Sequence, residues 1–354
     1  MTETLELISS VSQFAPNSKN PDPGRAVEAA RRAEAAGFDR LLVGYGSTRA
    51  DGWITSSFVM AQTTTMKILL AHRPGFMEPT VAARMGTTLD VYSGGRFSFN
   101  IITGGSPSDQ RRDGDFADHA TRYARSIEYV DVMKRAWTAT EPFDFAGAFY
   151  RFERAWHDVR PVQRPYPPIY LGGSSAEAKP FAAKHADIYM SWSEPVADVA
   201  ERVLEMRRLA AAEGRPRPGF SVSMRLILGE TEEVAWTNAR AMLPEGGMPQ
   251  PTKLLHKEDA GRTRQLQLAA ASEVHDDRLW MGITALTDGQ GSTGALVGTP
   301  QQVVESLLRY VEVGATALLL TGPDGAYVDL PAGLVQDFRR QANAIMARQN
   351  AALA

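Results

Sequence analysis

Short apolar runs of strand length alternate with longer segments of helical periodicity from one end of the chain to the other. The run KILLAH at 67–72 is typical of a strand buried on both faces, as in a parallel sheet. Gly37 and the triplet Ser93-Gly94-Gly95 follow two helical segments, and glycine is common where a helix ends. The predicted strands are 6–14, 38–43, 67–72, 96–103, 169–171, 187–192, 220–228 and 317–320. The predicted helices are 24–37, 56–65, 80–92, 121–138, 174–185, 195–212, a segment after Glu230, 300–313 and 330–348.

Eight strands in one alternating series favour a closed (β/α)8 TIM barrel over an open doubly wound sheet. No GxGxxG motif follows the first strand, so the usual dinucleotide-binding signal of an open sheet is missing. The 354 residues fit one barrel domain that spans 1–354. We therefore predict an α/β protein with a single barrel domain.

Three segments interrupt the strand–helix series, at about 104–120, 141–165 and 246–299. The second contains FDFAGAFYRFERA, which predicts a hairpin with its turn at Gly147. The third is the longest and is rich in glycine, proline, lysine and arginine, and we interpret it as a mobile lid. We expect all three to adjoin the C-terminal ends of strands, where barrel enzymes carry their active sites.

Composition excludes several classes of function. The formal net charge is −3, which gives no sign of binding to nucleic acid or to an acidic membrane surface. The chain has no cysteine, which excludes disulfides, thiolate metal sites and cysteine nucleophiles. The opening sequence MTETLELISS is not a signal peptide, and no apolar run approaches the ~20 residues that span a bilayer. HExxH, Walker A and GxSxG motifs are also missing. We expect a soluble cytoplasmic protein without a metal site.

The sharpest local feature is the sequence LGGSS at 171–175, where a predicted strand runs directly into a helix. Glycine lets a ligand approach the backbone, and the free N–H groups of a new helix attract phosphate. A second interpretation needs no ligand, because Ser174 and Glu177 have the spacing of a capping box. Barrel phosphates are most common after strands seven and eight, whereas this junction follows the fifth.

Several polar residues stand where strands end or helices begin. Asn100 and Thr103 either present an amide and a hydroxyl to a flat heteroaromatic ligand or satisfy local backbone groups. His119 precedes a helix, and Tyr123 lies one turn further on the same face. The two either bind an anion or belong to a solvated surface. His72 ends a buried strand and either faces the barrel mouth or packs in the core.

Two residues of the later strands are candidates for contact with a substrate. Trp192 ends the sixth strand and either walls a substrate pocket or belongs to the core. Arg225 lies within the seventh strand and shares a face with Ser221 and Ser223 by alternation. A buried arginine needs an anionic partner or several acceptors. Arg225 therefore either binds an acidic substrate or forms an internal salt bridge.

Several of these motifs belong to a longer pattern with a fixed order. Its segments are EPTVAARMGTTLDVYSGG at 78–95, RFSFNIITG at 96–104, FADHATRY at 116–123, RPYPPIYLGGSS at 164–175 and YMSWSEP at 189–195. In these segments the chain resembles the FMNH2-dependent alkanesulfonate monooxygenases, a branch of the bacterial-luciferase-like family. The resemblance runs from about 37 to 195 and continues more weakly to the C-terminus.

The resemblance implies a two-component monooxygenase that uses O2 and FMNH2, the latter supplied by a separate NAD(P)H:flavin reductase. Its substrate would be a small organosulfur compound, cleaved by analogy to sulfite and an aldehyde. The resemblance also implies a homodimer or homotetramer.

Matching motif by motif gives roles to individual residues. The residues that match the FMN phosphate site are Gly173, Ser174, Ser175, His119 and Tyr123. The residues that match the surroundings of the isoalloxazine ring are Asn100, Thr103, Gly104, Ala71 and His72. Between Ala71 and His72 the family often has a non-proline cis peptide. Trp192 matches an active-site tryptophan.

The substrate-binding set of the alkanesulfonate enzymes is not matched. Ser223 and Arg225 stand where that family has an Arg-x-His pair, and Arg49 stands where it has a cysteine. The family's lid arginine falls near 287–288 here, and LTGPDG at 320–325 replaces its Tyr-x-His.

The substrate is therefore open, and an anionic one needs a different set of cations. Arg49, Arg73 and Arg225 are candidates to rebuild an anion pocket. Two alternatives also stay open: an F420-dependent oxidoreductase that transfers hydride on the same barrel, and a non-catalytic flavin-binding protein.

Overall fold

Eight parallel strands close into a barrel in the computed structural model, which describes residues 4–11, 20–104, 106–249, 259–289 and 294–352. The barrel strands are, in order, β1 (Glu6–Ser10), β2 (Arg40–Val43), β3 (Lys67–His72), β4 (Phe97–Ile101), β7 (Ile169–Gly172), β8 (Ile188–Trp192), β9 (Gly219–Leu228) and β13 (Ala317–Thr321). β9 pairs with β8 on one side and with β13 on the other, and β13 pairs with β1, which closes the ring. The predicted (β/α)8 barrel is confirmed, and each predicted strand segment supplies one of its strands.

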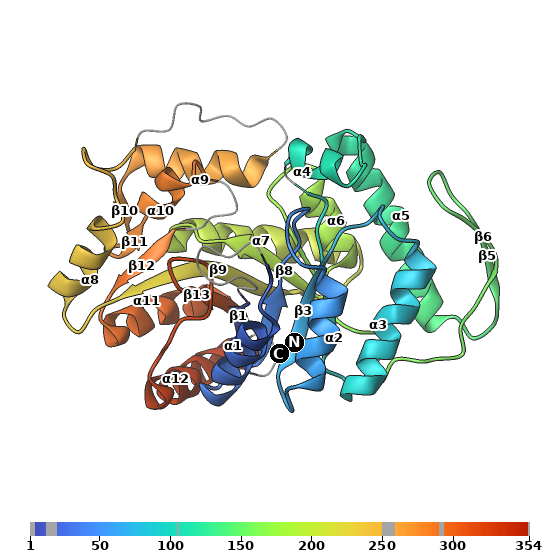
Figure 1. Ribbon diagram of the computed structural model, residues 1–354, viewed down its shortest axis with the longest axis horizontal. Helices are drawn as coiled ribbons and strands as arrows, with labels where there is room; N and C mark the ends of the chain where they lie inside the picture. Colours follow the sequence, from blue (N-terminus) through green and yellow to red (C-terminus); the bar gives the residue numbers. More distant parts are fainter. Residues whose placement is uncertain (1–3, 12–19, 105, 250–258, 290–293, 353–354) are drawn as a thin grey trace.

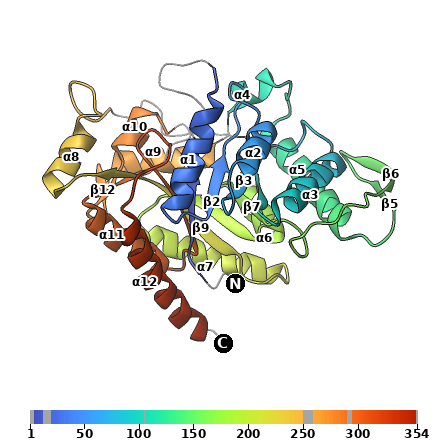
Figure 2. The same cartoon turned by 60° about the horizontal axis from the view of Figure 1, so that its bottom comes forward.

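Helices cover the outside of the barrel (Figures 1 and 2). The main covering helices are α1 (Pro23–Ala35), α2 (Gly52–Ala61), α3 (Pro79–Ser93), α5 (His119–Thr138), α6 (Ala178–His185), α7 (Val196–Ala212), α11 (Pro300–Glu312) and α12 (Ala332–Ala351). Local sequence sets their ends: α3 stops at Gly94, which has a left-handed φ of 67°, and Thr299 forms a capping box with Gln302 before α11. Within the described residues no helix is both long and apolar enough to cross a membrane.

Alternation along the strands separates an inner layer from an outer layer. Ile8, Leu69 and Tyr170 belong to an apolar cluster inside the barrel, whereas Leu70 and Phe99 belong to the larger core beneath the helices. The same alternation directs the polar residues of these strands. In β3, the side chain after Leu70 points inward and the next one points outward.

A buried ion pair fills the bottom of the barrel. The Arg40 guanidinium donates from Nε to Oε1 of Glu6 at 2.8 Å, and from Nη1 to the Ser98 hydroxyl at 2.7 Å. Its Nη2 also lies 2.8 Å from Oε1 of Glu6, and the Tyr170 hydroxyl donates to the other carboxylate oxygen. Each nitrogen of Arg40 therefore has an acceptor. We call the Arg40–Glu6 ion pair, which Ser98 and Tyr170 complete, the floor pair.

The second interruption of the barrel series is a hairpin, as predicted. Strands β5 (Phe143–Ala146) and β6 (Arg151–Ala155) are antiparallel, and they lie on the outer side of α3 and α5 (Figure 1). The hairpin follows α5 and leads into β7, so the expectation that it adjoins a C-terminal strand end is wrong. The carboxylate of Glu128 holds its turn, accepting backbone N–H groups of Ala148, Phe149 and Tyr150.

The third interruption carries regular structure over the residues that are described. Its elements, with the helix before it, are α8 (Glu232–Arg240), α9 (Ala260–Ala271), β10 (Val274–His275), β11 (Leu279–Trp280), α10 (Gly282–Leu286) and β12 (Ala295–Gly298). β12 runs parallel to the far half of β9, starting with Ala295 opposite Arg225. Part of the predicted lid, at 250–258 and 290–293, lies outside the described residues, so the lid stays a prediction.

Candidate functional site

Two loops meet at the C-terminal end of the barrel, one leading from β4 to α5 and the other from β7 to α6. Tyr123, in the first turns of α5, lies between them. Burial raises the pKa of its phenol, while hydrogen bonds with the side chains of Thr103 and Ser175 act in the opposite direction. Thr103 follows β4 and Ser175 follows β7, so the phenol joins the two loops.

Gly173 allows close packing at this junction. Its φ of +135° is a conformation that side-chain-bearing residues rarely adopt. A Cβ there would lie 2.7 Å from the Cβ of Ala178 and 3.1 Å from the hydroxyl of Tyr123. The Tyr189 hydroxyl donates to the carbonyl of Gly173 at 2.7 Å and fixes the turn. Only glycine fits this position, because both the backbone angle and the space exclude a side chain.

The predicted capping box at this junction is wrong. Helix α6 begins at Ala178, and the Ala178 N–H donates to the Ser175 hydroxyl at 3.1 Å. The N-cap of α6 is Glu177, which makes no side-chain capping bond, and Ser174 and Gly173 lie before the turn that leads to it. The sequence pattern matched a capping box three residues too early, because a turn at 175–177 separates the glycines from the helix.

His119 completes the group formed by the two loops. It is the first residue of α5, and its ring centroid lies 4.8 Å from that of Tyr123. Its Nδ1 is 3.7 Å from a carboxylate oxygen of Glu177, across the junction. The structure thus brings together His119, Tyr123, Gly173 and Ser175, which the sequence placed in one phosphate site.

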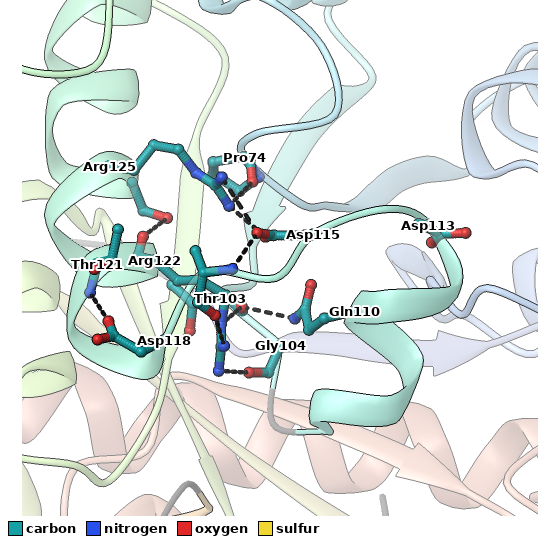
Figure 3. A network of polar contacts seen from close by, with 12 residues as sticks. Pro74, Thr103, Gly104, Gln110, Asp113, Asp115, Asp118, Thr121, Arg122 and Arg125 are labelled. Carbon is teal, nitrogen blue, oxygen red and sulfur yellow. Dashed lines mark hydrogen bonds and ion pairs between the residues drawn. The ribbon is translucent and has the colours of Figure 1, made fainter.

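Buried polar side chains fix the shape of the loop after β4 (Figure 3). Arg122 donates to the carbonyls of Thr103 at 3.2 Å, Gly104 at 3.3 Å and Ala117 at 2.7 Å. The Gln110 amide donates to the Thr103 carbonyl at 2.9 Å and occupies the space beside Gly104, 1.4 Å from where a Cβ would stand. Sequence reasoning missed Arg122 and Gln110, although Arg122 lies inside the FADHATRY motif.

A second ion pair ties this loop to the one after β3. Arg125 of α5 lies 2.5 Å from the Asp115 carboxylate and donates to the Pro74 carbonyl at 3.3 Å. The guanidinium also lies over Gly75, 2.3 Å from where a Cβ would stand. Arg125 therefore joins the loops that follow β3 and β4 (Figure 3).

The predicted ring-binding residues at the end of β3 separate onto two faces. Ala71 lies opposite Asn100 of β4, and alternation directs both side chains into the barrel. His72 points outward instead: its Nε2 is 2.7 Å from the Tyr129 hydroxyl of α5, and burial lowers its pKa to about 3. Of the two interpretations of His72, packing in the core is confirmed, and a position facing the mouth is wrong. The cis peptide bond within the described residues is Arg164–Pro165, so the family's non-proline cis bond is not found at Ala71.

Trp192 and Arg225 both belong to the inner face of the late strands. Trp192 lies opposite Ser223 of β9 and packs beside α9, where a Cβ on Gly261 would stand 3.2 Å from its ring. Burial lowers the pKa of Arg225, and the negative charge of Asp324 in the loop after β13 opposes that shift. Arg225 is thus a half-buried cation at the barrel end, with an acid nearby.

The other two arginines of the expected anion pocket have different surroundings. Arg49 is exposed in the loop after β2. Arg73 is buried, and its Nη2 donates to a carboxylate oxygen of Asp109 at 2.7 Å. The prediction of one pocket built from three available arginines therefore does not hold: one is at the surface and another is already paired.

Comparison with known proteins supplies the wider context. A family model described as luciferase-like monooxygenase matches residues 5–317. EDTA monooxygenase from Chelativorans sp. BNC1 superimposes with a TM-score of 0.72 and 17% identity, covering 98% of this chain and 94% of that one. A long-chain alkane monooxygenase gives a TM-score of 0.71 and 18% identity, covering 99% and 92%. An F420-dependent secondary alcohol dehydrogenase gives 0.67 and 17%, covering 96% and 99%. At these identities the solved structures speak for the fold alone.

Proposed function

The chain belongs to the luciferase-like monooxygenase family, and from that premise we propose that it is a two-component monooxygenase working on reduced FMN and O2. A separate NAD(P)H:flavin reductase would supply the FMNH2. The substrate would be a small organosulfur compound of alkanesulfonate or sulfone type. The observation that carries the proposal is the glycine turn at Gly173, with the hydroxyl groups of Tyr123 and Ser175 gathered around it.

The residues around this turn fit a flavin mononucleotide phosphate. The absence of a side chain at Gly173 lets the Tyr123 hydroxyl pack next to the turn, and Ser174 follows directly. Tyr123 and Ser175 carry hydroxyl donors, and His119 lies beside the Tyr123 ring. Phosphate oxygens accept hydrogen bonds from such groups, so each residue has a stated task in holding the nucleotide tail.

The inner face of the barrel end suits the isoalloxazine ring. Ala71 is small, and Asn100 beside it offers both an amide donor and an acceptor to a heteroaromatic edge. Gln110 and Arg122 hold Thr103 and Gly104 in place from behind, so that wall is preformed. Reduced FMN, when bound, supplies the electrons that activate O2. This chain would orient the ring and exclude bulk water from it.

The substrate would enter from the side of β8 and β9. Trp192 would wall the pocket, and Arg225 would contact a polar group of the substrate. The segment 246–299, whose helix α9 packs beside Trp192, would close over the bound substrate as a lid. We assign no catalytic role to His72, because it lies on the outer face of β3.

A reductase-coupled assay tests this function. The protein is titrated with FMN and with F420, followed by fluorescence, and O2 uptake and sulfite release are then measured with sulfonates and sulfones. We expect FMN to bind and at least one compound to raise O2 uptake. FMN binding without turnover of any compound would instead favour a flavin-binding protein without catalysis.

A second candidate has one specific observation in its favour. The fold also resembles an F420-dependent secondary alcohol dehydrogenase, with a TM-score of 0.67. Hydride transfer from reduced F420 would then replace oxygen chemistry. Tight binding of F420, with no binding of FMN, would select this candidate.

We also propose that the protein is a cytoplasmic homodimer or homotetramer. Large apolar side chains are exposed on α2 and at the end of α3, namely Ile54, Phe58, Val91 and Tyr92. Exposed large apolar residues occur at many subunit interfaces. Sedimentation equilibrium tests this, and a monomer at micromolar concentration contradicts it.

A further inference from the structure

Arg73 lies among the loops at the C-terminal end of the barrel. It is the first residue after β3, and its side chain is only 6% exposed. The rings of Tyr45 and Phe76 are stacked, and the guanidinium carbon lies 4.1 Å and 5.9 Å from their centroids. Tyr45 follows β2. Asp109, the ion-pair partner of Arg73, lies in α4 (Pro107–Arg112), which follows β4. Arg73 is therefore enclosed by three loops of the face that carries the candidate site.

Most of the hydrogen-bonding capacity of Arg73 is unused. Its Nη2 donates to Asp109, but Nε and Nη1 are buried and have no hydrogen-bond partner among the described residues. Burying an unsatisfied donor is unfavourable, so such groups call for an explanation such as a ligand. Gln110, next to Asp109, adds a buried amide oxygen without a partner in the same part of the structure. Unsatisfied donors and an unsatisfied acceptor thus occur near α4.

The charge of Arg73 is nevertheless already balanced. Oδ1 of Asp109 accepts the hydroxyl of Ser47 at 2.5 Å and its N–H at 3.1 Å, while Oδ2 accepts Arg73. Burial tends to raise the pKa of Asp109, but these hydrogen bonds and the Arg73 charge hold it below its ordinary value. Asp109 therefore stays ionised at neutral pH. Arg225, on the inner face of β9, has the negative charge of Asp324 near it.

Arg73 is neutralised by Asp109 and still has free N–H donors, and this combination favours one chemical class of ligand group. A further anion would add a net negative charge to a buried pair that is already neutral, and burial of uncompensated charge is strongly unfavourable. A neutral oxygen acceptor would instead gain charge-assisted hydrogen bonds without adding charge. We propose that Arg73 recognises a neutral acceptor on the substrate, such as a sulfone, carbonyl or amide oxygen, and that the site disfavours sulfonates.

This inference deepens the proposed function and rests on it, because it names the substrate class of the same site. The acceptor would reach Arg73 between the loop after β2 and helix α4. These two segments meet across Arg73 through the carboxylates of Asp109, which accepts Ser47, and of Asp113, which accepts the Tyr45 hydroxyl at 2.6 Å. Side-chain contacts of this kind can part without unfolding either loop.

Two probes of similar size test the selectivity, dimethyl sulfone and methanesulfonate, which differ in charge. Their dissociation constants are measured by ligand-observed NMR on the FMN-loaded and the FMN-free protein. We expect the wild type to bind the sulfone about tenfold more tightly than the sulfonate. We expect Arg73→Met to lose about tenfold in sulfone affinity. Preference for the sulfonate, binding of neither probe, or unchanged sulfone affinity in Arg73→Met overturns the proposal.

Asp109→Asn supplies a gain-of-binding test. With its balancing charge removed, Arg73 should accept an anion, so the preference should shift toward methanesulfonate by about tenfold. Asp51→Asn is the control, because it removes the same charge from the loop after β2 away from Arg73, and asparagine can still cap α2. An equal shift in both variants would mean that overall charge, not Arg73, sets the preference. The wild-type comparison decides the matter even where a variant does not fold.

Loss of the proposed function and loss of the role of Arg73 give different results. FMN affinity is measured by fluorescence quenching on the same samples. If FMN does not bind, the proposed function fails. If FMN binds but the probes show the opposite selectivity, only the assignment of Arg73 fails.

Discussion

The two ends of the barrel each hold a buried arginine–carboxylate pair, and the two pairs are satisfied to different degrees. In the floor pair, every nitrogen of Arg40 has an acceptor, and the side chains of Arg40 and Glu6 are 5% and 13% exposed. At the mouth, Arg73 donates from Nη2 to Asp109, while Nε and Nη1 have no partner in the described part of the chain.

The difference teaches what each pair is for. A buried ion pair is favourable only when additional hydrogen bonds satisfy its remaining groups, and the floor pair meets that condition. The pair at the mouth lacks these additional hydrogen bonds, so it stabilises the fold less, and two nitrogens of Arg73 can still donate to another group. We therefore expect changes at the floor to alter stability and changes at the mouth to alter binding. Four measurements test this division.

The largest effect is expected at the floor. Arg40→Met leaves the buried Glu6 carboxylate without its cation. Burial tends to raise the pKa of Glu6, and in the wild type the charge of Arg40 opposes that effect. The free energy of unfolding should fall by about 3–5 kcal/mol, measured by urea denaturation. FMN affinity of the folded fraction should not change. Combining Arg40→Met with Glu6→Gln should restore part of the loss, and no restoration would contradict the ion-pair explanation.

At the mouth, Gly173→Ala should act on binding. The new Cβ meets Ala178 at 2.7 Å in a backbone conformation that alanine rarely adopts, so the turn must distort. We expect FMN binding to weaken by about 1–3 kcal/mol, measured by fluorescence titration. Gly114→Ala is the control, because Gly114 also has a positive φ of +88° but open space around it. Equal loss of FMN affinity in both variants would show that backbone strain alone is responsible.

The stability of the protein in mild acid tests a residue outside both ion pairs, His72 on the outer face of β3. Burial holds the pKa of His72 at about 3, below its ordinary value of 6.5, so the unfolded chain binds a proton that the folded protein does not. The contribution of neutral His72 to the free energy of unfolding is fully present above pH 6.5. It decreases as the pH falls towards 3, by up to about 1.4 kcal/mol per pH unit. His72→Gln should remove this slope from urea denaturation series between pH 6.5 and 5. An unchanged slope would mean that other groups, such as His185, dominate it.

The smallest effect on stability is expected from Arg73→Met. The substitution removes buried donors that lack partners, and the Asp109 carboxylate, 22% exposed to water, keeps both hydrogen bonds from Ser47. The free energy of unfolding should fall by only about 0.5–1 kcal/mol in the same urea assay. A loss as large as that of Arg40→Met would remove the distinction between the two ends of the barrel.

Sequence periodicity was sufficient for the barrel but not for the direction of side chains within it. In KILLAH both faces of the strand are apolar and buried, so alternation could not tell which face is inside. The sequence therefore left His72 either at the mouth or in the core, and in the structure it contacts Tyr129 of α5. The position of the hairpin was available from chain order alone, because it follows a helix and precedes a strand.

The part of the candidate site that was predictable from the sequence lies in two short motifs, LGGSS and FADHATRY. The glycine turn at 173 and its partners Tyr123 and Ser175 all lie in segments that the sequence singled out. The pairing of Arg73 with Asp109 was not predictable, because it depends on where the loop after β4 folds back. No local pattern encodes a contact of that kind.

Closure of the ring by β13 has a consequence for the nascent chain. β1 pairs with β13 through Glu6 and Ala317, and the N–H of Leu5 donates to Asn343 of the last helix. At about 5–20 residues per second, the roughly 300 residues between the two strands take about 15–60 s to leave the ribosome. Throughout that time one edge of β1 has no native neighbour, and an unpaired edge is where strands of other chains attach. Protection from aggregation during translation is therefore most needed at the very first strand.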